Sequence, residues 1–264
     1  MKHGRWLRST VCLAALAMMG NARADAAAQK VLDCMRANVP ISLQIKEVEL
    51  KSIDRAGAER VLTGKVYASR IDGLVRVLLL ISRPRDLDGA AYLLREGATG
   101  AKDDIFLFLP AIQRVRRITG ASADGSLLGT DFSYNDMKQL QNAFGDAVAT
   151  LDKPTMIEQR PVQVLNLAPL AGAPARYSRV RAYVDDKACV ALKVEFLEGN
   201  AVRKELTAPV AGLQRSEGYW YLSDILMRDL KDKTSTRLKV VGVASGDKDL
   251  PSRLFDPTSF YRAH

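Results

Sequence analysis

The sequence predicts a mainly β protein of the α+β class, in which one large antiparallel sheet is accompanied by a few short helices. Three observations support this fold class. Runs with a period-two apolar pattern recur along most of the chain, and turn residues such as Asp72-Gly73 separate them. Helical patterns do not alternate with these runs as in a βαβ repeat, so neighbouring strands should be antiparallel. A long, twisted antiparallel sheet tends to curl toward a barrel.

The pattern places each element in order. The Ala-rich residues 26–38 suit a short helix that ends before Pro40. A second helix is expected over residues 135–144, and a short terminal segment over residues 253–261. The expected strands cover residues 42–52, 59–71, 74–83, 90–96, 105–109, 113–119, 156–168, 177–185, 190–197, 202–208, 219–229 and 234–243.

The strand at residues 105–109 is apolar on both faces. Ile105, Leu107 and Leu109 alternate with Phe106 and Phe108, so each set lies on its own side of the sheet. Both sides must therefore be covered. The cover could be the protein's own core, or an apolar ligand in a cavity, and the pattern leaves these two alternatives open.

The first 24 residues are typical of a cleaved secretory signal peptide. Lys2, Arg5 and Arg8 form a basic start, residues 11–20 form an apolar stretch, and Ala22-Arg23-Ala24 fits a small-x-small cleavage site. Residues 25–264 are then expected to form a single domain. Removal of four basic and no acidic residues lowers the formal net charge from +9 to +5. We therefore expect an exported protein of moderately basic character.

The distribution of histidine and cysteine excludes several kinds of site. The two histidines are His3 and His264, so the mature body lacks the histidine that Ser-His-Asp and Cys-His catalysis and His-based metal sites require. Phosphate-loop, dinucleotide-binding and metal-spacing motifs are also missing, and we expect neither an enzyme nor a cofactor. Cys34 and Cys189 remain in the mature chain. In an oxidising compartment they are expected to form a disulfide, the alternative being two separate buried thiols.

The densest basic cluster is formed by Arg114, Arg116 and Arg117. Arginine binds phosphate through paired hydrogen bonds, so the cluster could contact a lipid phosphate or an acidic partner. The alternative is a solvated outer strand face. Nucleic acid is not an expected partner, because no aromatic stacking platform accompanies the arginines.

The central region resembles the signature of the LolA-like outer-membrane lipoprotein-sorting proteins of Gram-negative bacteria. The resemblance is carried by Phe108-Leu109-Pro110, Arg114-Val115-Arg116-Arg117-Ile118, and then Gly129, Asp131, Phe132, Ser133 and Tyr134. Weaker similarities follow in the same order, at Tyr177–Tyr183, Leu192–Phe196, Gly218-Tyr219-Trp220, Met227, Thr236 and Leu254-Phe255. The likeness covers most of residues 40–260.

The resemblance implies an incomplete, strongly curved antiparallel barrel whose mouth is closed by short α-helices. It implies a periplasmic carrier that shields the acyl chains of a lipoprotein or lipid during transfer toward the outer membrane. Members of the family often work with membrane transporters of the resistance-nodulation-division type. The arginine-rich signature and the extra length belong to a separate branch of the family, so the cargo can differ.

Two functional hypotheses follow. A carrier needs an apolar cavity, and its candidate lining residues are Val77, Leu79, Leu107, Leu109, Phe132, Val194, Phe196 and Trp220. The alternative is a non-transport binding or assembly factor of the cell envelope, whose barrel interior is filled by its own side chains. The first predicts bound lipid, and the second predicts an exposed docking surface.

Overall fold

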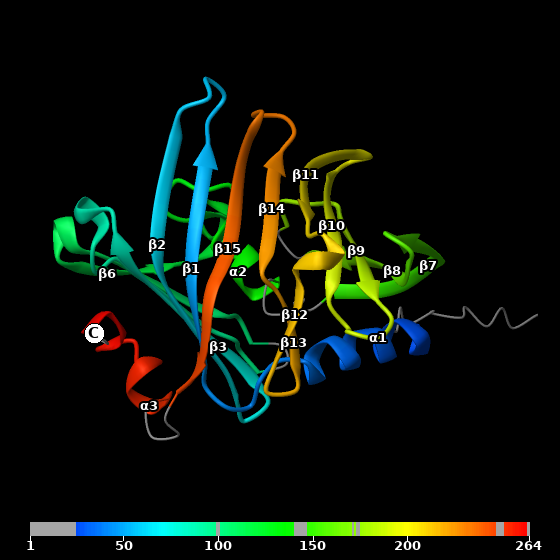
Figure 1. Ribbon diagram of the computed structural model, residues 1–264, viewed down its shortest axis with the longest axis horizontal. Coiled ribbons are helices and arrows are strands. Elements are labelled where there is room, and N and C mark those ends of the chain that lie inside the picture. Colours follow the sequence, from blue (N-terminus) through cyan, green and yellow to red (C-terminus); the bar gives the residue numbers. More distant parts are fainter. Residues whose placement is uncertain are drawn as a thin grey trace, which may run out of the picture.

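The computed structural model describes residues 25–98, 101–139, 147–170, 172, 175–246 and 251–262. A strongly curved sheet dominates the described residues (Figure 1). The sheet has thirteen strands in the order β6-β5-β4-β3-β2-β1-β15-β14-β11-β10-β9-β8-β7, and every recorded pairing is antiparallel. β6 and β7 are its two free edges, so the barrel remains open. The predicted fold class is confirmed.

The first half of the chain forms a meander. Its strands are β1 (Gln44–Ile53), β2 (Glu59–Ile71), β3 (Leu74–Arg83), β4 (Ala91–Arg95), β5 (Asp104–Leu109) and β6 (Arg114–Ile118). The β2–β3 turn is the predicted Asp72-Gly73 hairpin, and both residues have positive φ, as a tight hairpin turn requires.

The second half of the chain forms the other side of the curved sheet. Its strands are β7 (Ala147–Ile157), β8 (Arg160–Pro169), β9 (Arg179–Asp185), β10 (Ala191–Glu198), β11 (Ala201–Thr207), β14 (Asp224–Asp229) and β15 (Thr234–Ser245). β15 pairs with β1 on one side and with β14 on the other, so it joins the two halves. β12 (Leu213–Ser216) and β13 (Tyr219–Leu222) form a separate hairpin.

Helices are few and short. α1 (Ala26–Ala37) lies along the lower edge of the second half of the sheet, beside the β12–β13 hairpin (Figure 1). Asp25 caps its first turn, because its carboxylate accepts a hydrogen bond from the Ala27 N–H. α2 (Asp136–Gln139) is the start of the helix predicted over residues 135–144, and residues 140–146 lie outside the described residues. α3 (Pro251–Leu254) belongs to the C-terminal segment.

Both faces of β5 are covered by the protein itself. Ile105, Leu107 and Leu109 pack in the large core on the concave face of the sheet. On the convex face, Phe106 and Phe108 belong to a smaller cluster that the C-terminal residues Leu254, Phe255, Phe260 and Tyr261 complete. The Phe108 and Tyr261 rings stack with centroids 4.2 Å apart. For this strand, the open choice between core and ligand is therefore settled in favour of core.

Two strand predictions were wrong, and two further strands were not predicted. Residues 156–168 were expected to form one strand, but the chain turns at Glu158 and Gln159, which adopt positive φ without the usual Gly or Asn. β7 was not predicted, because Asp152, Lys153 and Pro154 interrupt its apolar alternation. The sheet accommodates these residues because β7 is an edge strand and its pairing with β8 shifts register at this point.

The expected strand 219–229 is also two strands in different sheets. Ser223 separates β13 from β14, and its N–H and Oγ both donate to the Gly212 carbonyl, at 2.8 and 2.9 Å. β12 was not predicted at all, because its four residues are too few to show a period.

Candidate functional site

An apolar cavity lies on the concave face, where β1, β10, β11, β14 and β15 meet the β12–β13 hairpin. Alternate residues of each strand point to this side, so the cavity walls are the inward positions of the sheet. The strand side chains that line it are mostly apolar, among them Val48, Val66, Ala191, Val194, Phe196, Leu206, Ile225, Met227, Leu238 and Val240. The hairpin contributes Trp220, Tyr221 and Leu222 at the mouth.

The cavity is small in this conformation. Its volume is about 70 Å³, room for roughly two water molecules at about 30 Å³ each. Asn38, Gln44, Lys46 and Asp136 add polar groups to the lining. An apolar chain longer than a few carbons can therefore enter only if the hairpin or α1 moves outward.

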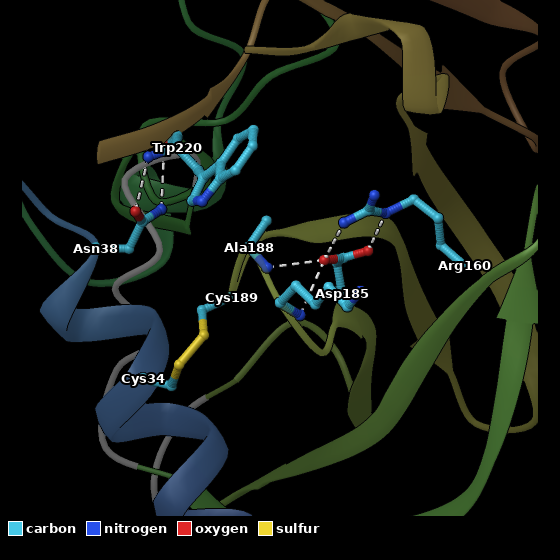
Figure 2. Close-up of a disulfide and its surroundings, with 8 residues drawn as sticks. Cys34, Asn38, Arg160, Asp185, Ala188, Cys189 and Trp220 are labelled. Atoms are coloured by element: carbon cyan, nitrogen blue, oxygen red, sulfur yellow. Dashed lines mark hydrogen bonds and ion pairs between the residues drawn. A yellow bond between two sulfur atoms is a disulfide. The ribbon is translucent and has the colours of Figure 1, made fainter. Parts of the chain in front are cut away.

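A pair of hydrogen bonds holds the hairpin to the end of α1. The Asn38 amide donates from Nδ2 to the Trp220 carbonyl, and its Oδ1 accepts from the Trp220 N–H, both at 2.8 Å (Figure 2). Asn38 is the C-cap residue of α1. The contact therefore joins two elements that are far apart in the sequence and both cover the cavity.

The predicted disulfide between Cys34 and Cys189 is present, with a Cα–Cα distance of 5.6 Å. It ties α1 to the corner between β9 and β10 (Figure 2). The two residues that follow Cys189, Val190 and Ala191, line the cavity. The alternative of two separate thiols is excluded. The cover is thus held by one covalent bond at the sheet and by two hydrogen bonds at the hairpin.

Asp185 stiffens the corner that carries Cys189. Its buried carboxylate forms an ion pair with Arg160 and accepts hydrogen bonds from the N–H groups of Lys187 and Ala188, at 3.0 and 2.7 Å (Figure 2). Burial by itself raises the pKa of Asp185, but the hydrogen bond from Arg160 and those from the backbone outweigh it, so the pKa is lowered.

The rest of the concave face is filled by one segment, residues 120–139, which we call the inner segment. Leu127, Phe132 and Met137 on it are at most 1% exposed and belong to the large core. The Asp131 carboxylate accepts hydrogen bonds from Thr234 and Thr236, and Lys204 Nζ donates to the Asp131 carbonyl at 2.6 Å. These bonds hold the inner segment against β11 and β15.

Asp136 lies where the inner segment meets the cavity. Its Oδ2 accepts from the Ser133 N–H at 2.6 Å and lies 3.9 Å from Lys204 Nζ. Burial is the largest influence and raises the pKa of Asp136, although Lys204 and the Ser133 bonds act in the opposite direction. The inner segment therefore contributes the Asp136 carboxyl group to the cavity lining, and burial disfavours the charged form of this group.

The structure brings together three of the eight candidate lining residues. Val194, Phe196 and Trp220 line the cavity. Val77, Leu79, Leu107, Leu109 and Phe132 share the concave face but pack in the core instead. Whether any of the eight contacts a ligand stays a prediction.

The arginine cluster lies elsewhere. Arg114, Arg116 and Arg117 are exposed on the edge strand β6, which four strands of the sheet separate from β1. Arg117 forms an ion pair with Asp104. Within the described part of the chain, Arg114 and Arg116 make no ion pair. They lie opposite Leu109 and Leu107 in the pairing, which places them on the concave side at its rim.

The sequence reasoning missed the polar members of the site. The side chains of Gln44 and Lys46 lie on the inward face of β1, the same face as those of Val48 and Leu50 further along the strand. These two polar residues could have indicated a binding site, because a strand normally places apolar residues at its inward positions. Asn38 and Asp136 carried no signal of this kind.

The described residues contain no group of three or more His, Cys, Asp and Glu side chains arranged to hold a metal ion. No helix among them combines the length and the apolar character that crossing a membrane requires.

Comparison with solved structures identifies the fold. A protein from Vibrio parahaemolyticus, described as an outer membrane lipoprotein-sorting protein domain, is 22% identical with a TM-score of 0.74, over 86% of this chain and 99% of that one. A DUF1329 family protein from Desulfovibrio piger is 21% identical with a TM-score of 0.75, over 87% and 97%. A LolA superfamily protein from Nitrosomonas europaea is 19% identical with a TM-score of 0.66, over 87% and 97%.

The sequence comparisons complete this result. No curated protein matches the chain. A protein-family model whose description reads "Uncharacterized protein" matches residues 73–262, which is most of the chain. The chain therefore belongs to the family of that model, and its fold is the open barrel of the LolA-like proteins.

Proposed function

We propose that the protein is a periplasmic carrier that shields an acyl chain of a lipid or lipoprotein during transfer toward the outer membrane. The observation that carries this proposal is the covered apolar cavity on the concave face of a LolA-like fold. Its walls are strand side chains, and its cover is a hairpin held by two hydrogen bonds to Asn38. Burial of a chain there would contribute about 0.8 kcal/mol per CH₂.

The proposal requires the cover to move, because about 70 Å³ is too small for a long chain. The hairpin is the element suited to this movement. It pairs only within itself, and Trp220, Tyr221 and Leu222 are partly exposed. In contrast, the sheet strands around the cavity are each paired on both sides. We therefore place the entrance between the hairpin and the end of α1.

Native mass spectrometry of the mature protein, purified gently from periplasm, tests the proposal. We expect a near-stoichiometric acylated species. Ala191→Leu adds a branched side chain to the cavity wall and should lower its occupancy. Ala201→Leu, on the exposed side of β11, is the matched control and should retain it. A clean protein mass that takes up no added lipid or lipopeptide would refute the carrier function.

A second function has its own supporting observation. The inner segment fills much of the concave face, as expected for an envelope binding or assembly factor that carries no lipid. Its docking surface would be the rim of β6, where Arg114 and Arg116 are exposed, and an inner-membrane transporter of the resistance-nodulation-division type is one candidate partner. Loss of a cross-linked partner in an Arg114→Glu, Arg116→Glu double variant, with no lipid in the wild type, would favour this function.

A further inference from the structure

The cavity contains a cationic side chain, that of Lys46, which forms no ion pair within the described part of the chain. Lys46 lies on the inward face of β1, and its Nζ is 5.0 Å from the centroid of the Tyr221 ring on the hairpin. Among the residues that the structure describes, no carboxylate forms an ion pair with Lys46. Burial lowers the pKa of Lys46 to about 8, so the amine is still mostly protonated at pH 7.

A hydrogen-bonding amide lies beside this amine. Gln44 precedes Lys46 by two residues, so both side chains point to the same side of β1. Gln44 is 3% exposed, and within the described ranges its amide makes no hydrogen bond, although its polar atoms keep some contact with solvent. Lys46 is partly buried beside it. A cation and an amide that are largely withdrawn from water are stabilised by a counter-ion and a hydrogen-bonding partner, so this end of the cavity suits an anion that can also accept hydrogen bonds.

The other titratable groups that line the cavity do not supply that anion. They are Asp136 and Tyr221. Asp136 Oδ2 is engaged by the Ser133 N–H, and its nearest cation is Lys204. The Tyr221 ring faces the amine, and burial raises the pKa of its hydroxyl, which favours the neutral form. Glu47 is next to Lys46 in sequence but lies on the opposite face, where it pairs with Lys65.

We propose that the Lys46 amine and the Gln44 amide bind the anionic head group of a single-chain amphiphile whose acyl chain occupies the apolar part of the cavity. The head group is a carboxylate or a phosphate, both of which accept charge-assisted hydrogen bonds from an ammonium group. Val48, Val240 and Leu238 continue from this polar end into the apolar wall. The inference rests on the carrier function proposed above and names its ligand class.

Titration calorimetry with three ligands of one chain length tests the inference. Decanoate, decyl phosphate and 1-decanol share the alkyl chain and differ in the head group. We expect the wild type to bind one of the two anions about tenfold more tightly than decanol, the scale of one charge-assisted hydrogen bond. The anion that is favoured identifies the head group as a carboxylate or a phosphate.

Substitution of the amine shows whether it causes the preference. Lys46→Gln should bring the affinity for the anion down to that for decanol and leave the decanol affinity unchanged. Lys65→Gln is the matched control, because it removes a lysine from the neighbouring strand on the opposite face. It should keep the preference, and the far-ultraviolet circular dichroism of both variants should match that of the wild type.

The wild type provides an independent measurement if Lys46→Gln does not fold. The preference should decline above about pH 9 as the amine loses its proton, while decanol binding stays level and the carboxylate remains ionised. Equal affinity for decanol and both anions would overturn the head-group inference and leave the carrier function intact. A preference that persists in Lys46→Gln would also overturn it. Failure of all three ligands to bind would overturn both proposals.

Discussion

The two ends of the concave face differ in what covers them. Beside β3 and β4, the inner segment packs directly onto the sheet through α2 and Tyr134, whose ring stacks on that of Tyr92 with centroids 5.9 Å apart, and the neighbouring Phe132 of this segment is fully buried. Beside β10, β11, β14 and β15, the cover is the β12–β13 hairpin with α1, and a cavity remains beneath it. The strands themselves are alike, since both ends present alternating apolar residues inward.

This difference shows that the curved sheet supplies mostly apolar walls at both ends, while the elements that pack over it determine whether a core or a cavity forms. The inner segment is held by buried side chains and by the Asp131 bonds to Thr234 and Thr236. The hairpin is held by two hydrogen bonds to Asn38, by a hydrogen bond from Ser245 to Glu217 in its turn, and by partly exposed apolar and aromatic side chains. Weakly held cover over an apolar surface is what a reversible binding site requires.

Truncation of a buried side chain of the inner segment should have the largest effect on stability. Phe132→Ala removes a fully buried ring between the sheet and the inner segment and should lower the free energy of unfolding by about 3–5 kcal/mol. Urea denaturation followed by circular dichroism measures this. Met156→Ala, at a side chain 57% exposed on β7, is the control and should change stability by less than about 0.5 kcal/mol. A small loss for Phe132→Ala would show that the inner segment is not tightly packed.

Removal of the disulfide should weaken the cover that α1 and the β12–β13 hairpin form over the cavity. The Cys34→Ser, Cys189→Ser double variant opens a link between residues 155 apart in sequence and should cost about 2–4 kcal/mol. Because the bond ties α1 to the cavity corner, ligand exchange should also become faster. Denaturation and stopped-flow release of a fluorescent fatty acid measure the two effects. The single Cys34→Ser variant should lose as much stability, and unchanged release in either variant would contradict the role of α1 as cover.

The corner beneath α1 should give a defined dependence on acid. The lowered pKa of Asp185 means that its contribution is present above the ordinary carboxyl pKa of about 4 and is lost as the pH falls through the folded-state value. Asp185→Asn should cost about 1–3 kcal/mol at pH 7, because Arg160 loses its partner. At pH 3 the difference from the wild type should be smaller. Urea titrations at the two pH values check this, and a difference that grows on acidification would be the wrong sign.

Filling the cavity should have the smallest effect on stability. Ala191→Leu places apolar atoms in existing space and should change the free energy of unfolding by less than about 1 kcal/mol, in the stabilising direction. The same change should reduce acyl-chain uptake, so stability and binding separate at this end of the molecule. Thermal denaturation and decanol titration give the two values. A large destabilisation would indicate that the space beside Ala191 is already filled.

Much of the fold could be predicted because strand alternation is a local property. The meander from β1 to β6 follows from its period-two pattern and from turns such as Asp72-Gly73, whose residues favour positive φ. The turn at Glu158 and Gln159 could not be predicted in this way, since neither residue type favours it. It is stabilised by the pairing of β7 with β8, which only the folded sheet provides.

The sequence by itself determined that the sheet has apolar walls, that Cys34 and Cys189 can pair, and that the Asp131-Phe132 region belongs to a LolA-like signature. Tertiary structure alone decided that Phe132 is buried in the core of the concave face while Val194, Phe196 and Trp220 line a cavity. It also placed Lys46 in that cavity with no ion pair to any residue that the structure describes. The physical reason is that the period-two pattern of a strand predicts which side chains point inward, whereas their burial depends on which distant segment of the chain packs over them.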